Sequence, residues 1–323
     1  MPDYPIKFTP LLKEKIWGGN KLKEILHKNG GEQKIGESWE ISGIENETSV
    51  VSNGKYRGKD LTEILKLHRE NLVGKKVYKK FGNNFPLLVK FIDANTELSV
   101  QLHPNDALAK ERHNAFGKTE MWYILQADDE AKINIGFKES IDKNTYLKHL
   151  QEGTIVSLLN FEKIKTGDAF FINTGKVHAI CAGVLLAEIQ QASNITYRIY
   201  DWDRKDDHGK SRELHTELAL EAIDFEVKND FRLSYNQEIN TASNIVRNEY
   251  FTTNFLPVKG KVCKDHKDLD SFIIYMCTSG KAVITVNNHS EVIERGQTLL
   301  IPAKCKQIEI VAENAELLEV YID

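Results

Sequence analysis

The sequence lacks the features that mark nucleic-acid-binding and membrane-spanning proteins. Its 323 residues carry 43 Lys and Arg against 47 Asp and Glu, so it has no basic excess that would favour nucleic acid. No stretch approaches ~20 consecutive apolar residues, so we expect no transmembrane helix. The first residues carry charges and prolines where a signal peptide needs an apolar core. We therefore expect a cytoplasmic protein that binds neither nucleic acid nor a membrane.

Cysteine is scarce and lacks metal-binding spacing. There are four cysteines, without a CxxC pair: Cys181, Cys263, Cys277 and Cys305. Because they lie in or near apolar runs, we expect reduced, buried thiols and not zinc ligands. The composition, 41% hydrophobic and 28% charged, fits a globular protein, and the length favours about two domains.

Most of the chain reads as short apolar runs separated by turn residues, which favours many antiparallel strands. The clearest runs are residues 86–93, 121–127, 131–137, 168–173, 271–277 and 281–286. Helical spacing is rarer and is found at 61–72, 140–153 and 212–225. Asp60 and Glu63 predict a capping box at the start of the first helix. The fold class is therefore mainly β, a sandwich or barrel with a few added helices.

A polar segment, residues 227–244, interrupts the apolar rhythm and suggests a domain boundary. We predict one domain over residues 1–230 and a second, purely β, domain over 231–323. Eight of the ten histidines precede residue 230. A weak repeat links the two parts, because 167–173 and 296–302 both read as Gly, five residues, then a turn residue. Only the first copy continues to a histidine, His178.

Four polar side chains stand out as a candidate metal site. Gln101 and His103 are two residues apart, so on a strand they share a face with Ser99. Glu120 precedes one apolar run, and His178 begins another. Two histidines, a carboxylate and an amide are donors suited to Zn²⁺ or a similar divalent ion. Spacing alone also allows a solvent-facing strand, a surface carboxylate and a turn histidine.

Several separated motifs resemble the type I mannose-6-phosphate isomerases of the cupin superfamily, in their short bacterial form. The matching segments, in chain order, are 15–19 (KIWGG), 37–42 (ESWEIS), 86–90 (PLLVK), 99–104 (SVQLHP), 117–121 (GKTEM), 178–180 (HAI) and 188–198. The sequence departs from the pattern at three positions. Asn173 replaces a usual Pro, Ala182 replaces a usual Asn, and Asn194 stands where many members carry Asp.

The resemblance implies a double cupin-like jelly roll. Residues 1–230 would form the catalytic cupin domain with helical additions, and 231–323 a degenerate cupin-like β-domain. One Zn²⁺ per chain, or another divalent ion, would be bound by the four residues Gln101, His103, Glu120 and His178.

The implied reaction interconverts mannose 6-phosphate and fructose 6-phosphate by moving a proton between C1 and C2 through a cis-enediol. Lys118, two residues before Glu120, would face the same cavity. Lys118 and Arg198 are the expected substrate-binding cations, with Lys90 and Ser99 as further substrate-binding residues. Arg198 is also an expected catalytic residue, because its planar fork suits either the phosphate or a developing enediolate. Asn194 cannot act as a carboxylate base. Glu188, Lys118 or a metal-bound water is then expected to carry the proton.

Three other functions fit the same motifs. One is a metal-dependent dioxygenase, a second is another sugar-phosphate isomerase, and a third is a non-catalytic module that senses sugar phosphates. Dioxygenases of this fold usually use more His ligands, so Gln101 and the pair Lys118 and Arg198 favour an isomerase. We expect a small sugar phosphate as the partner and a monomer or homodimer as the assembly.

Overall fold

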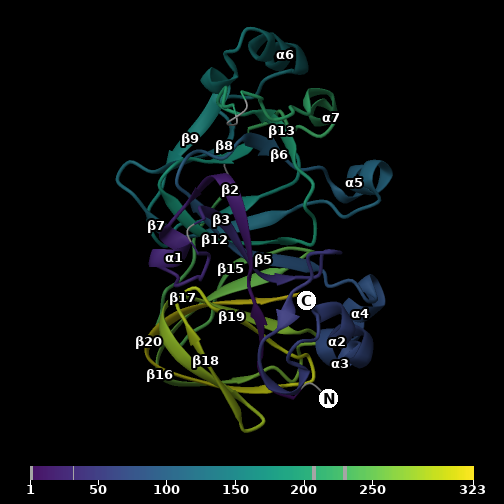
Figure 1. Ribbon diagram of the computed structural model, residues 1–323, viewed down its shortest axis with the longest axis vertical. Helices are drawn as coiled ribbons and strands as arrows, with labels where there is room; N and C mark the ends of the chain where they lie inside the picture. Colours follow the sequence, from purple (N-terminus) through teal and green to yellow (C-terminus); the bar gives the residue numbers. More distant parts are fainter. Residues whose placement is uncertain (1–2, 32, 206–208, 228–230) are drawn as a thin grey trace.

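The chain folds mainly into β-strands, as the short apolar runs predict. The computed structural model describes residues 3–31, 33–205, 209–227 and 231–323, and its strands form three antiparallel sheets (Figure 1). Two sheets occupy the upper half of Figure 1, and the C-terminal strands fill the lower half. Within these described ranges, no helix combines the length and apolar character that a transmembrane span requires.

A seven-stranded sheet forms the middle layer, in the order β14-β10-β7-β12-β5-β3-β2. In that order its strands are Arg232–Leu233, Ala169–Ile172, Glu120–Ala127, Val184–Gln191, Leu87–Ala94, Ile35–Ser42 and Leu11–Gly19. Every residue of β12, β5 and β3 is buried. Because side chains alternate between the faces of a strand, both faces of this sheet must be covered by other layers.

A five-stranded sheet covers one face of the seven-stranded sheet. Its order is β13-β6-β11-β8-β9, with strands Tyr197–Tyr200, Val100–Leu102, His178–Ile180, Lys132–Phe137 and Leu159–Lys163. Apolar residues of both sheets, such as Trp122, Leu186 and Ile133, belong to one buried cluster. The two sheets are therefore packed face to face, which is the arrangement of a β-sandwich.

The third sheet covers the opposite face. Its order is β15-β16-β20-β17-β19-β1-β4, and β18 pairs with β17. The strands are Ser243–Arg247, Thr252–Asp265, Gln307–Tyr321, Ile273–Val286, Thr298–Ile301, Ile6–Thr9, Val50–Val51 and, for β18, His289–Glu294. Strand β1 pairs with β19, so the start of the chain completes the C-terminal sheet.

The predicted domain boundary lies between residues 230 and 231. Residue 230 lies outside the described residues, so this boundary stays a prediction.

Short helices fill the remaining connections. They are α1 Lys21–Glu24, α2 Leu61–His68, α3 Glu70–Val73, α4 Lys75–Phe81, α5 Asp106–His113, α6 Lys143–Gln151 and α7 Thr216–Leu220, with 3₁₀ turns at Gly54–Tyr56 and Ile155–Leu158. The predicted capping box is confirmed, because Asp60 accepts from the Glu63 N–H and Glu63 accepts from the Asp60 N–H.

Three predicted elements differ from the observed ones. The helix expected over 61–72 is divided into α2 and α3 at Arg69, which has a positive φ of 48°. The helix expected over 212–225 is only Thr216–Leu220. Its flanks are bonded elsewhere, since the His215 N–H donates to the Arg198 carbonyl and the Asp224 N–H to the Gly175 carbonyl. The runs 271–277 and 281–286 belong to one strand, β17, rather than two. Gly280, at φ 72°, lies within an irregularity that bends the strand without ending it.

The expectation that all four thiols are buried is wrong for Cys263. Cys181, Cys277 and Cys305 are buried, but Cys263 is exposed. Strand β16 places Val262 in the core, so the next side chain points to solvent. All four thiols are free, as expected.

The repeated sequence pattern has the same local structure in both copies. Gly167 and Gly296 have positive φ angles of 86° and 84°, and each precedes a four-residue strand, β10 or β19. Only the first copy leads to a histidine. The halves thus share a structural unit but differ in their potential for metal binding.

Candidate functional site

Three predicted residues form a row across the five-stranded sheet. Gln101 on β6 is directly opposite His178 on β11 and also opposite Arg198 on β13. Directly opposed residues of antiparallel strands point to the same face, with Cβ atoms about 5 Å apart. The pairing register therefore brings an amide, an imidazole and a guanidinium side by side, although 97 positions separate Arg198 from Gln101 in the chain.

Both histidines are held in the same tautomer. Nδ1 of His103 lies 2.8 Å from the Ile195 carbonyl oxygen, and Nδ1 of His178 lies 2.8 Å from the Lys176 carbonyl oxygen. Since a carbonyl only accepts, each Nδ1 must carry the hydrogen, which leaves a lone pair on Nε2. Burial lowers the pKa of His178 to about 4 and that of His103 well below its ordinary value. Both rings are therefore neutral near pH 7.

Glu120 comes from the facing sheet and meets both histidines. One carboxylate oxygen lies 3.6 Å from His103 Nε2, and the other lies 3.6 Å from His178 Nε2. The ligand atoms of these three fully buried residues lie within 4.8 Å of one another. Neither Glu120 Oε1 nor His178 Nε2 has a hydrogen-bond partner among the described residues. Two neutral imidazoles and a carboxylate, with lone pairs converging, fit a divalent metal ion.

A chain of alternating charges leads from this cluster along the seven-stranded sheet. Lys118 Nζ lies 2.8 Å from Glu120 Oε2, 3.0 Å from His103 Nε2 and 3.9 Å from Glu188 Oε1. Lys90, opposite Glu188 in the register, lies 2.8 Å from the same Glu188 oxygen. Although burial lowers the pKa of Lys90, the neighbouring carboxylates of Glu188 and Glu37 outweigh it and raise that pKa. Lys90 therefore stays charged.

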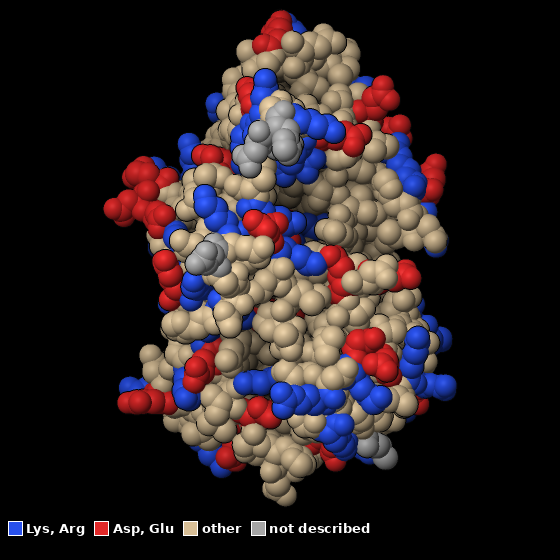
Figure 2. Space-filling model, viewed as in Figure 1, with Lys and Arg blue, Asp and Glu red and all other residues tan. Residues whose placement is uncertain are grey.

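These groups open into a cavity of ≈ 290 Å³ between the two sheets. Polar and charged residues dominate its lining, which includes Lys15, Glu37, Asn194 and Thr196. Figure 2 shows a hollow in the upper half of the molecule with Lys and Arg side chains gathered around it. A polar cavity rich in cations suits a small anionic ligand with hydroxyl groups.

Arg212 is a cavity residue that the sequence did not single out. It lines the cavity, and its Nε donates to Asp201 Oδ2 at 2.8 Å. Arg204 donates to the same buried carboxylate. Although burial raises the pKa of Asp201, Arg212 and Arg204 outweigh it and hold that pKa below its ordinary value. Asp201 therefore fixes Arg212 beside Arg198.

The nine predicted site residues come together in space. Six line the cavity: Lys90, Ser99, Gln101, Lys118, Glu188 and Arg198. The other three form the buried donor cluster, which contacts the cavity through Lys118. Glu188 pairs with lysines and not with Arg198. Lys15 and Glu37 also line the cavity and lie in the motifs KIWGG and ESWEIS, whereas Arg212 follows no recognisable spacing.

Comparisons with known proteins cover both halves of the chain. Residues 6–139 match the family model of the phosphomannose isomerase type I catalytic domain, and residues 241–322 match that of the mannose-6-phosphate isomerase cupin domain. The residues that match the cupin-domain model thus include the strands β15 to β20 of the C-terminal sheet.

Individual relatives match along nearly the whole length. The chain is 36% identical over 303 residues to a probable mannose-6-phosphate isomerase of Bacillus subtilis, GmuF, covering 93% of this chain and 94% of that one. It is 33% identical to a mannose-6-phosphate isomerase of Streptococcus mutans, covering 96% and 98%. The crystal structure of a mannose 6-phosphate isomerase from B. subtilis superposes with a TM-score of 0.89 at 32% identity, covering 99% and 100%.

Proposed function

This chain belongs to the type I mannose-6-phosphate isomerases, and from that premise we propose that it interconverts mannose 6-phosphate and fructose 6-phosphate. One observation carries the proposal. The buried donor cluster of His103, Glu120 and His178 meets a cavity of ≈ 290 Å³ through a lysine that contacts both. A metal-binding cluster beside a cation-rich cavity suits an aldose–ketose exchange on a phosphorylated sugar.

We assign one Zn²⁺ per chain to His103, Glu120 and His178, with Gln101 as the fourth ligand. The donor types support zinc, and other divalent ions would also be held. Bound there, the metal would polarise the sugar oxygens at C1 and C2 and so favour the enediolate. Each carbonyl accepts from Nδ1 and so leaves Nε2 of the same ring as the atom that would bind the metal.

The phosphate is assigned to the guanidinium end of the cavity. Arg198 lies in the row with Gln101, and the Nε of Arg198 is buried without a hydrogen-bond partner among the described residues. Arg212 lies in the same lining. Two guanidinium groups supply planar forks that match phosphate oxygens. Ser99, Lys90 and Lys118 then contact the sugar between the phosphate and the metal.

Proton transfer between C1 and C2 is assigned to Glu188 and Lys118. Their Oε1 and Nζ atoms lie 3.9 Å apart, and both residues line the cavity. Lys90 stays charged, so it orients Glu188 and does not take the proton. Both groups border the same cavity, which supports a shared role in moving the proton along the C1–C2 edge of the sugar.

A coupled assay tests the proposal. Protein loaded with Zn²⁺, Co²⁺ or Mn²⁺ is incubated with mannose 6-phosphate, and fructose 6-phosphate formation is followed through a dehydrogenase. Turnover with at least one metal is expected, and no turnover with all three would overturn the proposal. Oxygen uptake without isomerisation would favour the dioxygenase, and binding without either reaction would favour a sensing module. We further propose a cytoplasmic location and a monomer or homodimer.

A further inference from the structure

The segment that carries Lys118 lies against the start of helix α5. An added Cβ at Gly117 would come within 2.7 Å of the Asp106 nitrogen and 3.0 Å of the Pro104 carbonyl oxygen, so glycine is needed for this close approach. The Lys118 N–H donates to the same Pro104 carbonyl at 3.3 Å. Pro104 directly follows His103, a proposed metal ligand. The backbone of Lys118 is therefore fixed beside the buried donor cluster.

One carboxylate is hydrogen-bonded to the chain on both sides of Lys118. Asp106, the first residue of α5, accepts at Oδ1 from the Gly117 N–H at 2.7 Å and from Gln191 Nε2 at 2.9 Å. The oxygen of the same Gln191 side chain accepts from the Thr119 N–H at 2.8 Å. Asp106 therefore holds the amide before Lys118 directly and the amide after it through Gln191.

This hydrogen-bond network also reaches Glu188, the proposed partner of Lys118 in proton transfer. Gln191 is the last residue of β12, the strand that carries Glu188. The Gln191 N–H donates to the Thr119 carbonyl at 3.1 Å, so Gln191 is bonded to Thr119 through both its backbone and its side chain. Asp106 therefore ties the segment of Lys118 to the strand of Glu188.

The second oxygen of Asp106 connects the network to the C-terminal sheet. Tyr250, 144 positions along the chain, donates its hydroxyl to Asp106 Oδ2 at 3.0 Å. Tyr250 lies in the turn between β15 and β16, where its N–H donates to Asn248 Oδ1 at 2.8 Å. Burial, together with the Asp106 carboxylate, raises the pKa of Tyr250, so the hydroxyl keeps its proton and acts as the donor.

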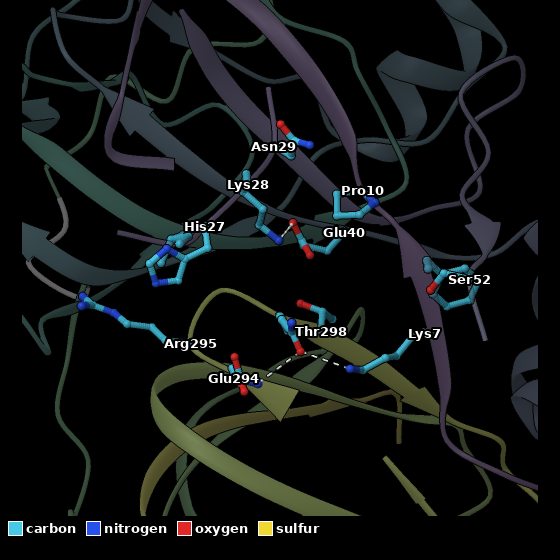
Figure 3. Close-up of a pocket in the computed structure, with 13 residues that line it drawn as sticks. Lys7, Pro10, His27, Lys28, Asn29, Glu40, Ser52, Glu294, Arg295 and Thr298 are labelled. Carbon is cyan, nitrogen blue, oxygen red and sulfur yellow. Dashed lines mark hydrogen bonds and ion pairs between the residues drawn. The ribbon is translucent and has the colours of Figure 1, made fainter. Parts of the chain in front are cut away.

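At a second cavity, by contrast, charged groups pair on their own sides. Figure 3 shows this cavity, of ≈ 330 Å³, with Lys28 and Glu40 on one side and Glu294, next to the C-terminal sheet, on the other. Lys28 and Glu40 pair with each other at 2.7 Å, and Glu294 pairs with Lys281 of its own sheet at 2.7 Å. These ion pairs do not connect the two sheets, whereas the hydrogen bond of Tyr250 does.

We propose that Asp106 is a positioning residue that holds Lys118 for the reaction, and that Tyr250 extends this support to the C-terminal sheet. The proposal rests on the proposed function, in which Lys118 and Glu188 move the proton. A reacting group misplaced by ~1 Å can cost roughly 100-fold in rate, and hydrogen bonds behind the group prevent such a displacement. Asp106 does not line the cavity of ≈ 290 Å³, so it acts through Lys118 and not on the sugar.

The proposal gives the C-terminal sheet a part in the reaction. No described residue of that sheet lines the cavity of ≈ 290 Å³. Its contribution is therefore indirect and passes through the Tyr250 hydroxyl and the Asp106 carboxylate to the backbone around Lys118.

Amide hydrogen exchange and steady-state kinetics of the full-length protein test the proposal together. Asp106→Ala removes both acceptor oxygens, so the amides of residues 117–119 should exchange about tenfold faster and kcat should fall about tenfold, with metal content unchanged. Asp106→Asn keeps an acceptor for Gly117 and Gln191, and its amide can donate to the Tyr250 oxygen, so kcat should return to within about threefold of the wild type. Tyr250→Phe removes one hydroxyl outside the cavity, and it should speed exchange of the same amides and lower kcat by about threefold.

Tyr235→Phe is the matched control. Tyr235 packs against the same core as Tyr250, but its hydroxyl donates to the Gly167 carbonyl. Tyr235→Phe should therefore leave both kcat and the exchange of residues 117–119 at their wild-type values.

Three results would overturn the proposal: equal effects of Tyr235→Phe and Tyr250→Phe, faster exchange without a fall in kcat, or Asp106→Asn as slow as Asp106→Ala. If Asp106→Ala fails to fold, Tyr250→Phe and its control still decide the question. If the wild type shows no turnover, the isomerase proposal fails, whereas the exchange rates still report whether Asp106 and Tyr250 hold the segment of Lys118.

Discussion

Trp122 donates its indole N–H to Glu188 Oε2 at 2.9 Å, on the seven-stranded sheet where the two residues are directly opposite each other. Trp122 also packs edge-on against His178, with ring centroids 5.4 Å apart. One buried aromatic side chain therefore contacts both a proposed metal ligand and a proposed proton carrier. It has no role in the reaction itself, but it fixes the direction of the Glu188 carboxylate.

The first prediction concerns this contact. Trp122→Phe removes the indole hydrogen bond and keeps an aromatic ring. A hydrogen bond to a charged group contributes about 1.5–3 kcal/mol, so we expect kcat to fall by roughly tenfold or more. KM should change little. Trp202→Phe, which removes an indole bond to the Leu98 carbonyl, is the matched control. An equal fall of kcat in both variants would contradict a positioning role.

The second prediction separates metal ligands from phosphate ligands. His103→Ala and His178→Ala each remove one Nε2 donor from the cluster and should lose bound metal, measured by elemental analysis after dialysis. Arg198→Ala should keep the metal and lose activity, because its guanidinium lies in the cavity lining and outside the donor cluster. Retention of metal by all three variants would show that the ligand assignment is wrong.

The third prediction concerns the arginine that the sequence did not reveal. Arg212→Gln should raise KM for the sugar phosphate by about tenfold through loss of a charge-assisted contact, with metal content unchanged. Arg204 binds the same Asp201 carboxylate and is absent from the cavity lining, so Arg204→Gln is the matched control. If the two variants have similar KM values, Arg212 does not contact the substrate and its role is structural.

Part of the site could be predicted because side chains two residues apart in extended backbone point to the same side. Lys118 and Glu120, two residues apart, do meet at 2.8 Å, as the alternation predicts. Spacing alone could not join Gln101, Glu120 and His178. Their meeting depends on strand pairing and on the packing of two sheets, and the family resemblance supplied that information.

Other parts of the structure left no local signal. Arg212 reaches the cavity because Asp201 holds it, and that contact follows from the fold of an irregular segment. Helix α7 was predicted too long, because helical spacing does not show that the His215 N–H donates to the Arg198 carbonyl instead of continuing the helix. Contacts between distant segments decided each of these features.

The fourth prediction concerns acid stability and Glu319, a buried carboxylate of the C-terminal sheet. Tyr275 donates to it at 2.8 Å, and Lys264 lies 2.9 Å away. Although burial raises the pKa of Glu319, its contacts with His266 and Lys264 outweigh this and lower that pKa to about 2. The unfolded chain has the ordinary value near 4.5. The native state therefore binds the proton less readily than the unfolded state, and Glu319 stabilises the fold above about pH 4.5.

This stabilisation should disappear as the pH falls from about 4.5 towards 2, because protonation then favours the unfolded chain. Its size is on the order of 3 kcal/mol, at 1.36 kcal/mol per pKa unit. Urea unfolding followed between pH 7 and pH 3 should show a steeper loss of stability for the wild type than for Glu319→Gln. Glu309 lies on the same strand as Glu319, β20, and forms an exposed ion pair with Lys261 of β16. Glu309→Gln should therefore lose stability with falling pH as steeply as the wild type. If Glu319→Gln and the wild type lose stability in parallel, the low pKa of Glu319 is not a source of acid sensitivity.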